Sequence, residues 1–88
     1  MGVVEDLADD LARDTLEAMA ELGDDRYFHD VAKVLGASSP TLQEAFLTNM
    51  RIRLAAERGK SFVAATLKAR REGGTGPEAP RDAATGGH

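Results

Sequence analysis

The sequence predicts an all-α fold, a small bundle of three to four helices followed by a disordered C-terminal tail. Apolar residues recur every three or four positions through most of residues 3–72, which is the spacing of one helix face. Glycine, serine and proline separate these periodic segments. From residue 73 onward no large apolar residue remains to be buried. We therefore expect one helical domain over residues 1–72 and a disordered tail over residues 73–88.

The first helix is expected over residues 3–22. Its apolar stripe comprises Val4, Leu7, Leu11, Thr15, Ala18 or Met19, and Leu22. Acidic side chains near its start suit the positive end of the helix dipole, and Glu17 and Glu21 continue the acidity on the outer face. Gly23 is expected to end this helix, and Asp24 or Asp25 can cap the next one.

A second helix is expected over residues 26–35, followed by a sharp corner. Gly36 stands where a helix end favours a residue that tolerates a positive φ angle. Ser38 or Ser39 can cap the third helix, and Pro40 suits its first turn because the missing N–H would have no partner there. Two helices joined by so short a turn cross at a large angle, as in a helix-turn-helix unit.

The spacing of Ala32, Gly36 and Leu42, supported by Val31, Leu35 and Ala45, strengthens this interpretation. The run Val-Ala-Lys-Val-Leu-Gly-Ala-Ser-Ser-Pro-Thr-Leu resembles the helix-turn-helix units of small bacterial repressors. The resemblance covers about twenty residues and points to a superfamily, within which it implies DNA binding. The same pattern is also typical of a tight helical corner that has no role in DNA binding.

The third helix is expected to start near Pro40. Its apolar positions are Leu42, Ala45, Phe46, Met50, Leu54 and Ala55, with Leu47 and Ile52 widening the arc. So broad an arc indicates a central helix that is contacted on more than one side. Arg53 and Glu57 are spaced to form an ion pair. Gly59 is expected to end this helix, with Ser61 capping a fourth over residues 62–72; the alternative is one long helix with Gly59 inside it.

Charge is distributed unevenly along the chain, whose net charge is −4. Residues 1–40 carry ten acids and three bases, whereas residues 51–71 carry seven bases and one acid. This asymmetry indicates one acidic and one basic side, although solvated helix faces or mutual attraction between the halves would explain it equally well.

There is no cysteine, and hence no disulfide or zinc–thiolate site. No signal peptide or membrane span is recognisable, so a soluble cytoplasmic protein is expected.

The sequence offers little for catalysis or metal binding. His29 follows Asp25 by four residues, but such a pair is usually a surface hydrogen bond and not a metal site. Gly59, Lys60 and Ser61 match the end of a phosphate-binding loop, yet the required earlier glycine is replaced by Leu54. We therefore expect no enzymatic activity and no cofactor.

Two functional hypotheses follow. In the first, the chain is a small DNA-binding transcriptional regulator whose third helix enters the major groove. The candidate base contacts are Ser38, Ser39, Thr41, Gln43 and Glu44, and the candidate phosphate contacts are Arg51, Lys60, Lys68, Arg70 and Arg71. No arginine or lysine lies among the base contacts, which is unusual for such a surface.

In the second hypothesis, the chain is a non-enzymatic helical interaction module, an adaptor or an inhibitor, whose acidic first helix binds a basic surface on a partner protein. A homodimer is expected in either case, through an apolar stripe of the first or the C-terminal helix, because so small a domain buries little surface by itself.

Overall fold

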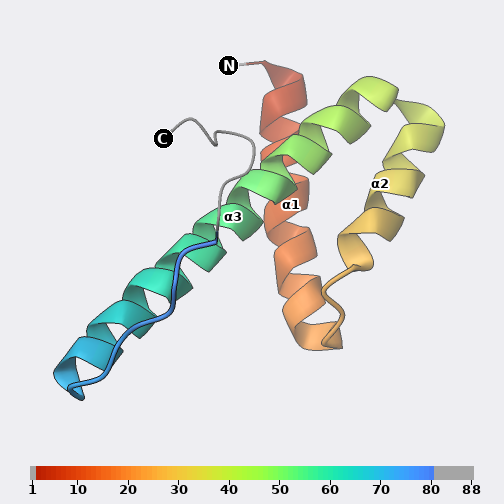
Figure 1. Ribbon diagram of the computed structural model, residues 1–88. Coiled ribbons are helices and arrows are strands. Elements are labelled where there is room, and N and C mark those ends of the chain that lie inside the picture. The colour runs from red at the N-terminus through yellow and green to blue at the C-terminus, as the bar shows by residue number, and fades with distance from the viewer. Residues whose placement is uncertain (1, 81–88) are drawn as a thin grey trace. The chain divides into compact units, whose positions relative to one another are not determined.

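The computed structural model describes residues 2–80, and these residues form three helices with no strand (Figure 1). The helices are α1 (Val3–Leu22), α2 (Tyr27–Ser38) and α3 (Pro40–Arg71). The all-α class is therefore confirmed, with three helices and not four. The chain divides into two compact units, one ending at Ala55 and the other beginning at Ala56.

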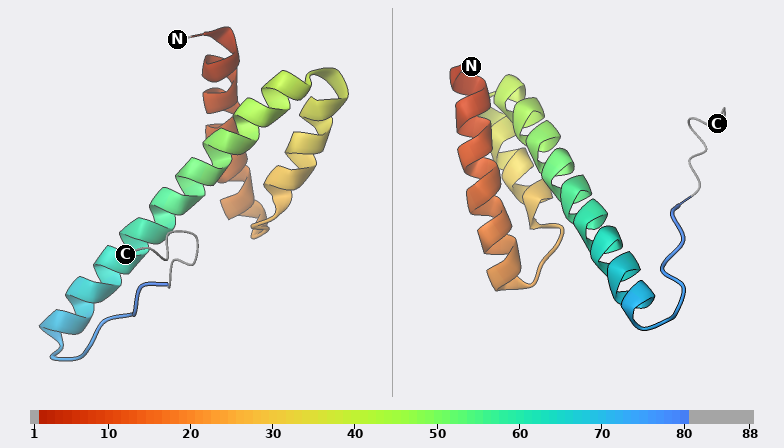
Figure 2. Two further views of the ribbon diagram at one scale, coloured as in Figure 1. Left: turned by 45° about the horizontal axis from the view of Figure 1, so that its top comes forward. Right: turned by 90° about the vertical axis from the view of Figure 1, so that its left-hand side faces the viewer.

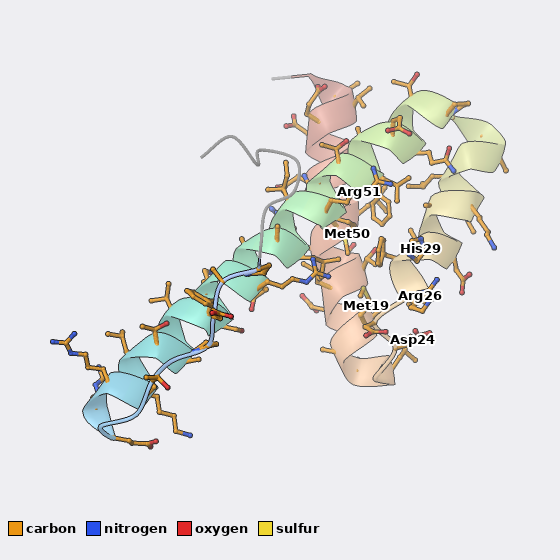
Figure 3. The ribbon with its side chains drawn as sticks, viewed as in Figure 1. Met19, Asp24, Arg26, His29, Met50 and Arg51 are labelled. Atoms are coloured by element: carbon orange, nitrogen blue, oxygen red, sulfur yellow. The ribbon has the colours of Figure 1, made fainter. Side chains whose placement is uncertain are left out.

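Helix α1 has the bounds that the periodicity predicts. Gly23 ends it with φ 66°, a left-handed conformation that glycine adopts without steric cost. The N–H of Asp24 then donates to the carbonyl of Met19 at 3.2 Å, which closes the last turn. The Asp24 carboxylate accepts the N–H of Arg26 at 3.0 Å, so it stabilises the connecting turn instead of capping α2 directly (Figure 3).

The connection between α2 and α3 is the single residue Ser39. A proline disfavours the helical conformation in the residue before it, and Ser39 is accordingly extended at φ −152° and ψ 99°. Its hydroxyl accepts the N–H of Leu42 at 3.1 Å, which caps the start of α3 as expected. The two helices therefore meet at a sharp corner (Figure 2).

The expectation that Gly36 ends the second helix is wrong. Gly36 lies inside α2, which continues to Ser38, and its φ angle is not positive. Its role is close packing: a Cβ atom at this position would lie 2.5 Å from Nε2 of Gln43. The Gln43 amide occupies this space and donates to the carbonyl of Ala32 at 3.0 Å, joining α3 to the middle of α2.

The core of the first unit lies between small residues of α1 and large residues of α3. Ala8 and Ala12 are 1% and 0% exposed, and Phe46 and Met50 are both 0% exposed. Thr15, Met19 and Ala32 complete the buried set; Figure 3 labels Met19 and Met50. A helix surface of alanines lets a neighbouring helix approach closely and pack large side chains against it.

The buried face of α1 is therefore displaced from the predicted stripe. Of the predicted stripe, Thr15 and Met19 are buried, whereas Leu7 is 47% and Leu22 61% exposed. The alanine arc and the leucine arc are adjacent on the helix, and the periodicity alone does not distinguish them.

The break expected at Gly59 is also wrong, because α3 continues through this residue to Arg71, and no fourth helix starts at residue 62. The helix ends in a Schellman motif at Gly73, which has φ 78°. In this motif the N–H of Gly74 donates to the carbonyl of Ala69 at 2.8 Å, and that of Gly73 to Arg70 at 3.2 Å.

Residues 74–80 follow without helix or strand, and the chain reverses direction after the end of α3 (Figure 1). A Cβ atom on Gly76 would lie 3.1 Å from Cα of Thr66, so a larger residue at this position would require a small shift of the chain. The expected disordered tail falls partly on residues 81–88, which lie outside the described part of the chain.

Candidate functional site

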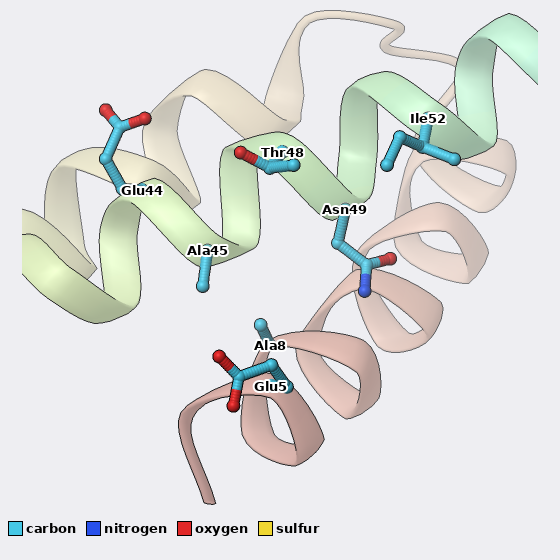
Figure 4. Close-up of a pocket in the computed structure, with 7 residues that line it drawn as sticks. All are labelled: Glu5, Ala8, Glu44, Ala45, Thr48, Asn49 and Ile52. Atoms are coloured by element: carbon cyan, nitrogen blue, oxygen red, sulfur yellow. The ribbon is translucent and has the colours of Figure 1, made fainter. Parts of the chain in front are cut away.

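A groove of about 320 Å³ runs between α1 and the first part of α3, within the first unit (Figure 4). It is lined by Glu5, Ala8, Glu44, Ala45, Thr48, Asn49 and Ile52. Ala8 and Ala45 point toward one another across it (Figure 4). Ile52, which is 64% exposed, supplies further apolar surface. The volume is at the lower end of that of small-ligand pockets and fits a few side chains of another molecule.

Two carboxylates border this apolar surface. Glu5 comes from the first turns of α1, and Glu44 from the start of α3 (Figure 4). Both residues are exposed, and neither carboxylate forms an ion pair with a residue of the described part of the chain. An apolar floor beside unpaired carboxylates is complementary to a side chain with an apolar stem and a positive end.

A polar cluster holds the two sides of the groove together. The Asp9 carboxylate of α1 accepts hydrogen bonds from the Arg53 guanidinium and from Nδ2 of Asn49, the latter at 3.4 Å. Arg53 Nε also donates to Oδ1 of Asn49 at 2.6 Å, and Arg13 pairs with Asp9 at 2.6 Å. The hydrogen bond from Arg53 is the main reason why the pKa of Asp9 lies below its usual value. The predicted Arg53–Glu57 pair is wrong, since Arg53 is directed to α1 instead.

The residues predicted to contact DNA bases have different surroundings. Ser38, Thr41 and Glu44 are exposed at the corner. Ser39 and Gln43 are half-buried, and both side chains form hydrogen bonds within the fold. The Ser39 hydroxyl caps α3, and the Gln43 amide donates to the carbonyl of Ala32. Three of the five side chains are therefore open to a ligand, and Gln43 would have to leave its bond to read a base.

The predicted phosphate contacts are all exposed but are divided between the two units. Arg51 belongs to the first unit, and the other four are in the second: Lys60, Lys68, Arg70 and Arg71. No ion pair involves any of these five cations in the part of the chain that the structure describes.

His29 is exposed and stacks on Phe28, with 4.1 Å between the ring centroids. No hydrogen bond links it to Asp25, although both belong to the described residues. Within residues 2–80 no group of three or more histidine, cysteine or acidic side chains could hold a metal ion. None of the described helices is both long and apolar enough to cross a membrane.

Comparison of the chain with protein-family models, with curated proteins and with solved structures found no match. The chemistry of its own surfaces therefore carries the functional argument.

Sequence reasoning missed the groove, although one signal was present. Ile52 widened the predicted apolar arc of α3 beyond what one packing interface needs, and it lies in the groove wall. Glu5 drew attention only as an acid near a helix start, because its place in the groove wall depends on how α1 packs against α3.

Proposed function

We propose that this chain is a helical protein-interaction module whose groove between α1 and α3 binds a basic amphipathic segment of a partner protein. The observation that carries the proposal is the open groove, in which Glu5 and Glu44 border an apolar surface formed by Ala45 and Ile52, with the buried Ala8 beneath it. Such a site combines apolar burial with a preference for positive charge.

The charge of the first unit supports the same conclusion. Residues 1–55 contain eleven acids and five bases, a net charge of −6. Like charges oppose the approach of a phosphate backbone, whereas a basic protein segment is attracted. The Gln43 amide points inward and donates to the carbonyl of Ala32, where it stabilises the corner between α2 and α3. A side chain used in this way is not available to read a DNA base, which favours protein binding over DNA binding.

Site-specific photo-crosslinking in the native host cells tests the proposal. A photoreactive residue at Thr48, in the groove wall, is expected to give a covalent adduct with a protein. The same residue at Lys33, exposed on α2, is the positional control. Glu5→Lys with Glu44→Lys should abolish the Thr48 adduct, and Glu17→Lys with Glu21→Lys, an equal charge change on exposed residues outside the groove, should not. Absence of a protein adduct at Thr48 would overturn the proposal.

DNA binding is a second candidate, favoured by the exposed cations of α3 and by the exposed residues at the helical corner. An electrophoretic shift at about 50 mM salt, where phosphate contacts are strongest, tests it. In that case Arg70→Ala with Arg71→Ala should weaken binding to all sequences alike. Gln43→Ala should instead cost about 1–3 kcal/mol on the preferred site only. A chain that shifts no DNA under these conditions is not a DNA-binding regulator.

A further inference from the structure

The second unit exposes an apolar face that its own chain leaves largely uncovered. Phe62, Val63 and Leu67 are 37%, 57% and 47% exposed. Gly59 and Thr66 lie at helical spacing from them and complete the stripe. The Thr66 hydroxyl donates to the carbonyl of Phe62 at 3.0 Å, so it is satisfied within the helix. We call these five residues the α3 stripe.

Gly59 is unexplained by contacts within the chain. A glycine inside a helix costs about 1 kcal/mol relative to alanine. A Cβ atom at Gly59 would have no neighbour within 4 Å, in contrast to Gly36, where Gln43 fills the space. A glycine at the start of an exposed apolar stripe is suited to the close approach of another helix.

Positive charge surrounds the stripe. Residues 58–71 contain five cations and no acid. Arg58, Lys60, Arg70 and Arg71 are adjacent to the stripe at helical spacing, whereas Lys68 lies on the far side of the helix. Two copies of this helix packed directly on each other would place like charges together, so the stripe favours an acidic partner surface.

We propose that the occupant of the groove is a second copy of this chain: the α3 stripe of each copy docks into the groove between α1 and α3 of the other. This inference rests on the proposed function and names its partner. The charges match, since Glu5 and Glu44 border the groove and Arg58 and Arg70 border the stripe. The exchange is reciprocal and produces a closed two-fold dimer with two equivalent contacts.

Reversing charge on each side of the contact tests the inference with the full-length chain. The wild type is expected to sediment at micromolar concentration as a particle of twice 9.4 kDa. The groove variant, Glu5→Lys with Glu44→Lys, and the stripe variant, Arg58→Glu with Arg70→Glu, should each be monomeric. An equimolar mixture should regain the dimer, because both contacts then join opposite charges. Variants that had merely unfolded would not regain it.

Matched variants control for net charge. Glu17→Lys with Glu21→Lys, and Lys33→Glu with Lys68→Glu, make the same changes away from the groove and the stripe and should leave the dimer intact. Raising the salt concentration should weaken the wild-type dimer.

Three results would overturn the inference. The wild type could be monomeric at about 100 μM, the equimolar mixture of the groove and stripe variants could stay monomeric, or the control variants could lose the dimer as completely as the groove and stripe variants do. A dimer that survives the groove variant would show that the stripe pairs with another surface. A monomeric wild type combined with a Thr48 adduct to a different protein would refute this inference and leave the proposed function standing.

Discussion

Gly36 and Gln43 form a contact in which the absence of a side chain on one residue makes room for the other. The Gln43 amide reaches Ala32 only because Gly36 carries no Cβ atom. We predict that Gly36→Ala alone changes the free energy of unfolding little. The gain of about 1 kcal/mol in helix propensity is offset by the loss of a hydrogen bond worth about 0.5–1.5 kcal/mol.

In a Gln43→Ala background the same Gly36→Ala change should stabilise the chain by about 1 kcal/mol, because nothing remains to be displaced. Urea unfolding of the four proteins of this double-mutant cycle measures the coupling. If the effect of Gly36→Ala were identical in both backgrounds, Gly36 would not be making room for Gln43.

Ser38 and Ser39 are adjacent, and only the second caps α3. We predict that Ser39→Ala destabilises the chain by about 1 kcal/mol, because the N–H of Leu42 loses its acceptor. Ser38 is exposed at the end of α2, so Ser38→Ala serves as the control and should be nearly neutral. Thermal melts followed by circular dichroism measure both variants. An equal fall in melting temperature in the two variants would contradict the assignment of Ser39 as the cap.

At the scale of the helices, Asp9 makes the stability of the α1–α3 packing dependent on pH. Its pKa is lowered in the folded chain, mainly by the Arg53 hydrogen bond. The stabilisation is therefore fully present above the ordinary pKa of 3.8 and is lost as the pH falls through the lowered value.

We predict that Asp9→Asn is less stable than the wild type at pH 7, and that the difference narrows as the pH falls below about 4. Asp10→Asn, which removes a partner of Arg13 only, is the control and should show a smaller difference at pH 7. Chemical unfolding across this pH range measures both. A constant difference between Asp9→Asn and the wild type at every pH would contradict the prediction.

The helices differ in how well the sequence predicted them, and the reasons are local. Strong signals determine the bounds of α1 and the start of α3: Gly23 must take a positive φ, and Pro40 forces Ser39 out of the helical conformation. Gly36 and Gly59 carried no such requirement. Both are tolerated inside helices, one because Gln43 needs the space and the other at a cost in helix propensity.

The site was less predictable than the helices, because it depends on which face of α1 is buried. Periodicity indicated a stripe containing Leu7, and the structure instead buries Ala8. That rotation places Glu5 in the groove with Glu44 and leaves Leu7 half-exposed. The choice between adjacent arcs follows from the fit of Phe46 and Met50 against alanines, which a single sequence does not reveal.

For the whole molecule, we predict that deleting residues 74–88 leaves the helices intact. Residues 74–80 are exposed and contribute little burial. The deletion removes the bond from Gly74 to Ala69 and the contact of Gly76 with Thr66. The melting temperature should change by no more than about 4 °C. The shortened chain should self-associate at least as strongly as the full-length chain, because removal of Gly76 makes Thr66 of the α3 stripe more accessible. A large fall in melting temperature would show that the tail stabilises the fold.

The central claim is that the groove binds the α3 stripe of a second copy, and a paramagnetic label tests it most directly. The chain contains no cysteine, so Thr41→Cys, exposed one turn before Glu44, carries a single spin label. Labelled chain is mixed with an equal amount of unlabelled, ¹⁵N-enriched chain, and the amide signals of the enriched copy are recorded. The account predicts broadening at residues 59–67 of the enriched copy, removed by Glu5→Lys with Glu44→Lys in the labelled copy. No broadening of any amide signal of the enriched copy, or broadening confined to residues outside the stripe, would contradict the account.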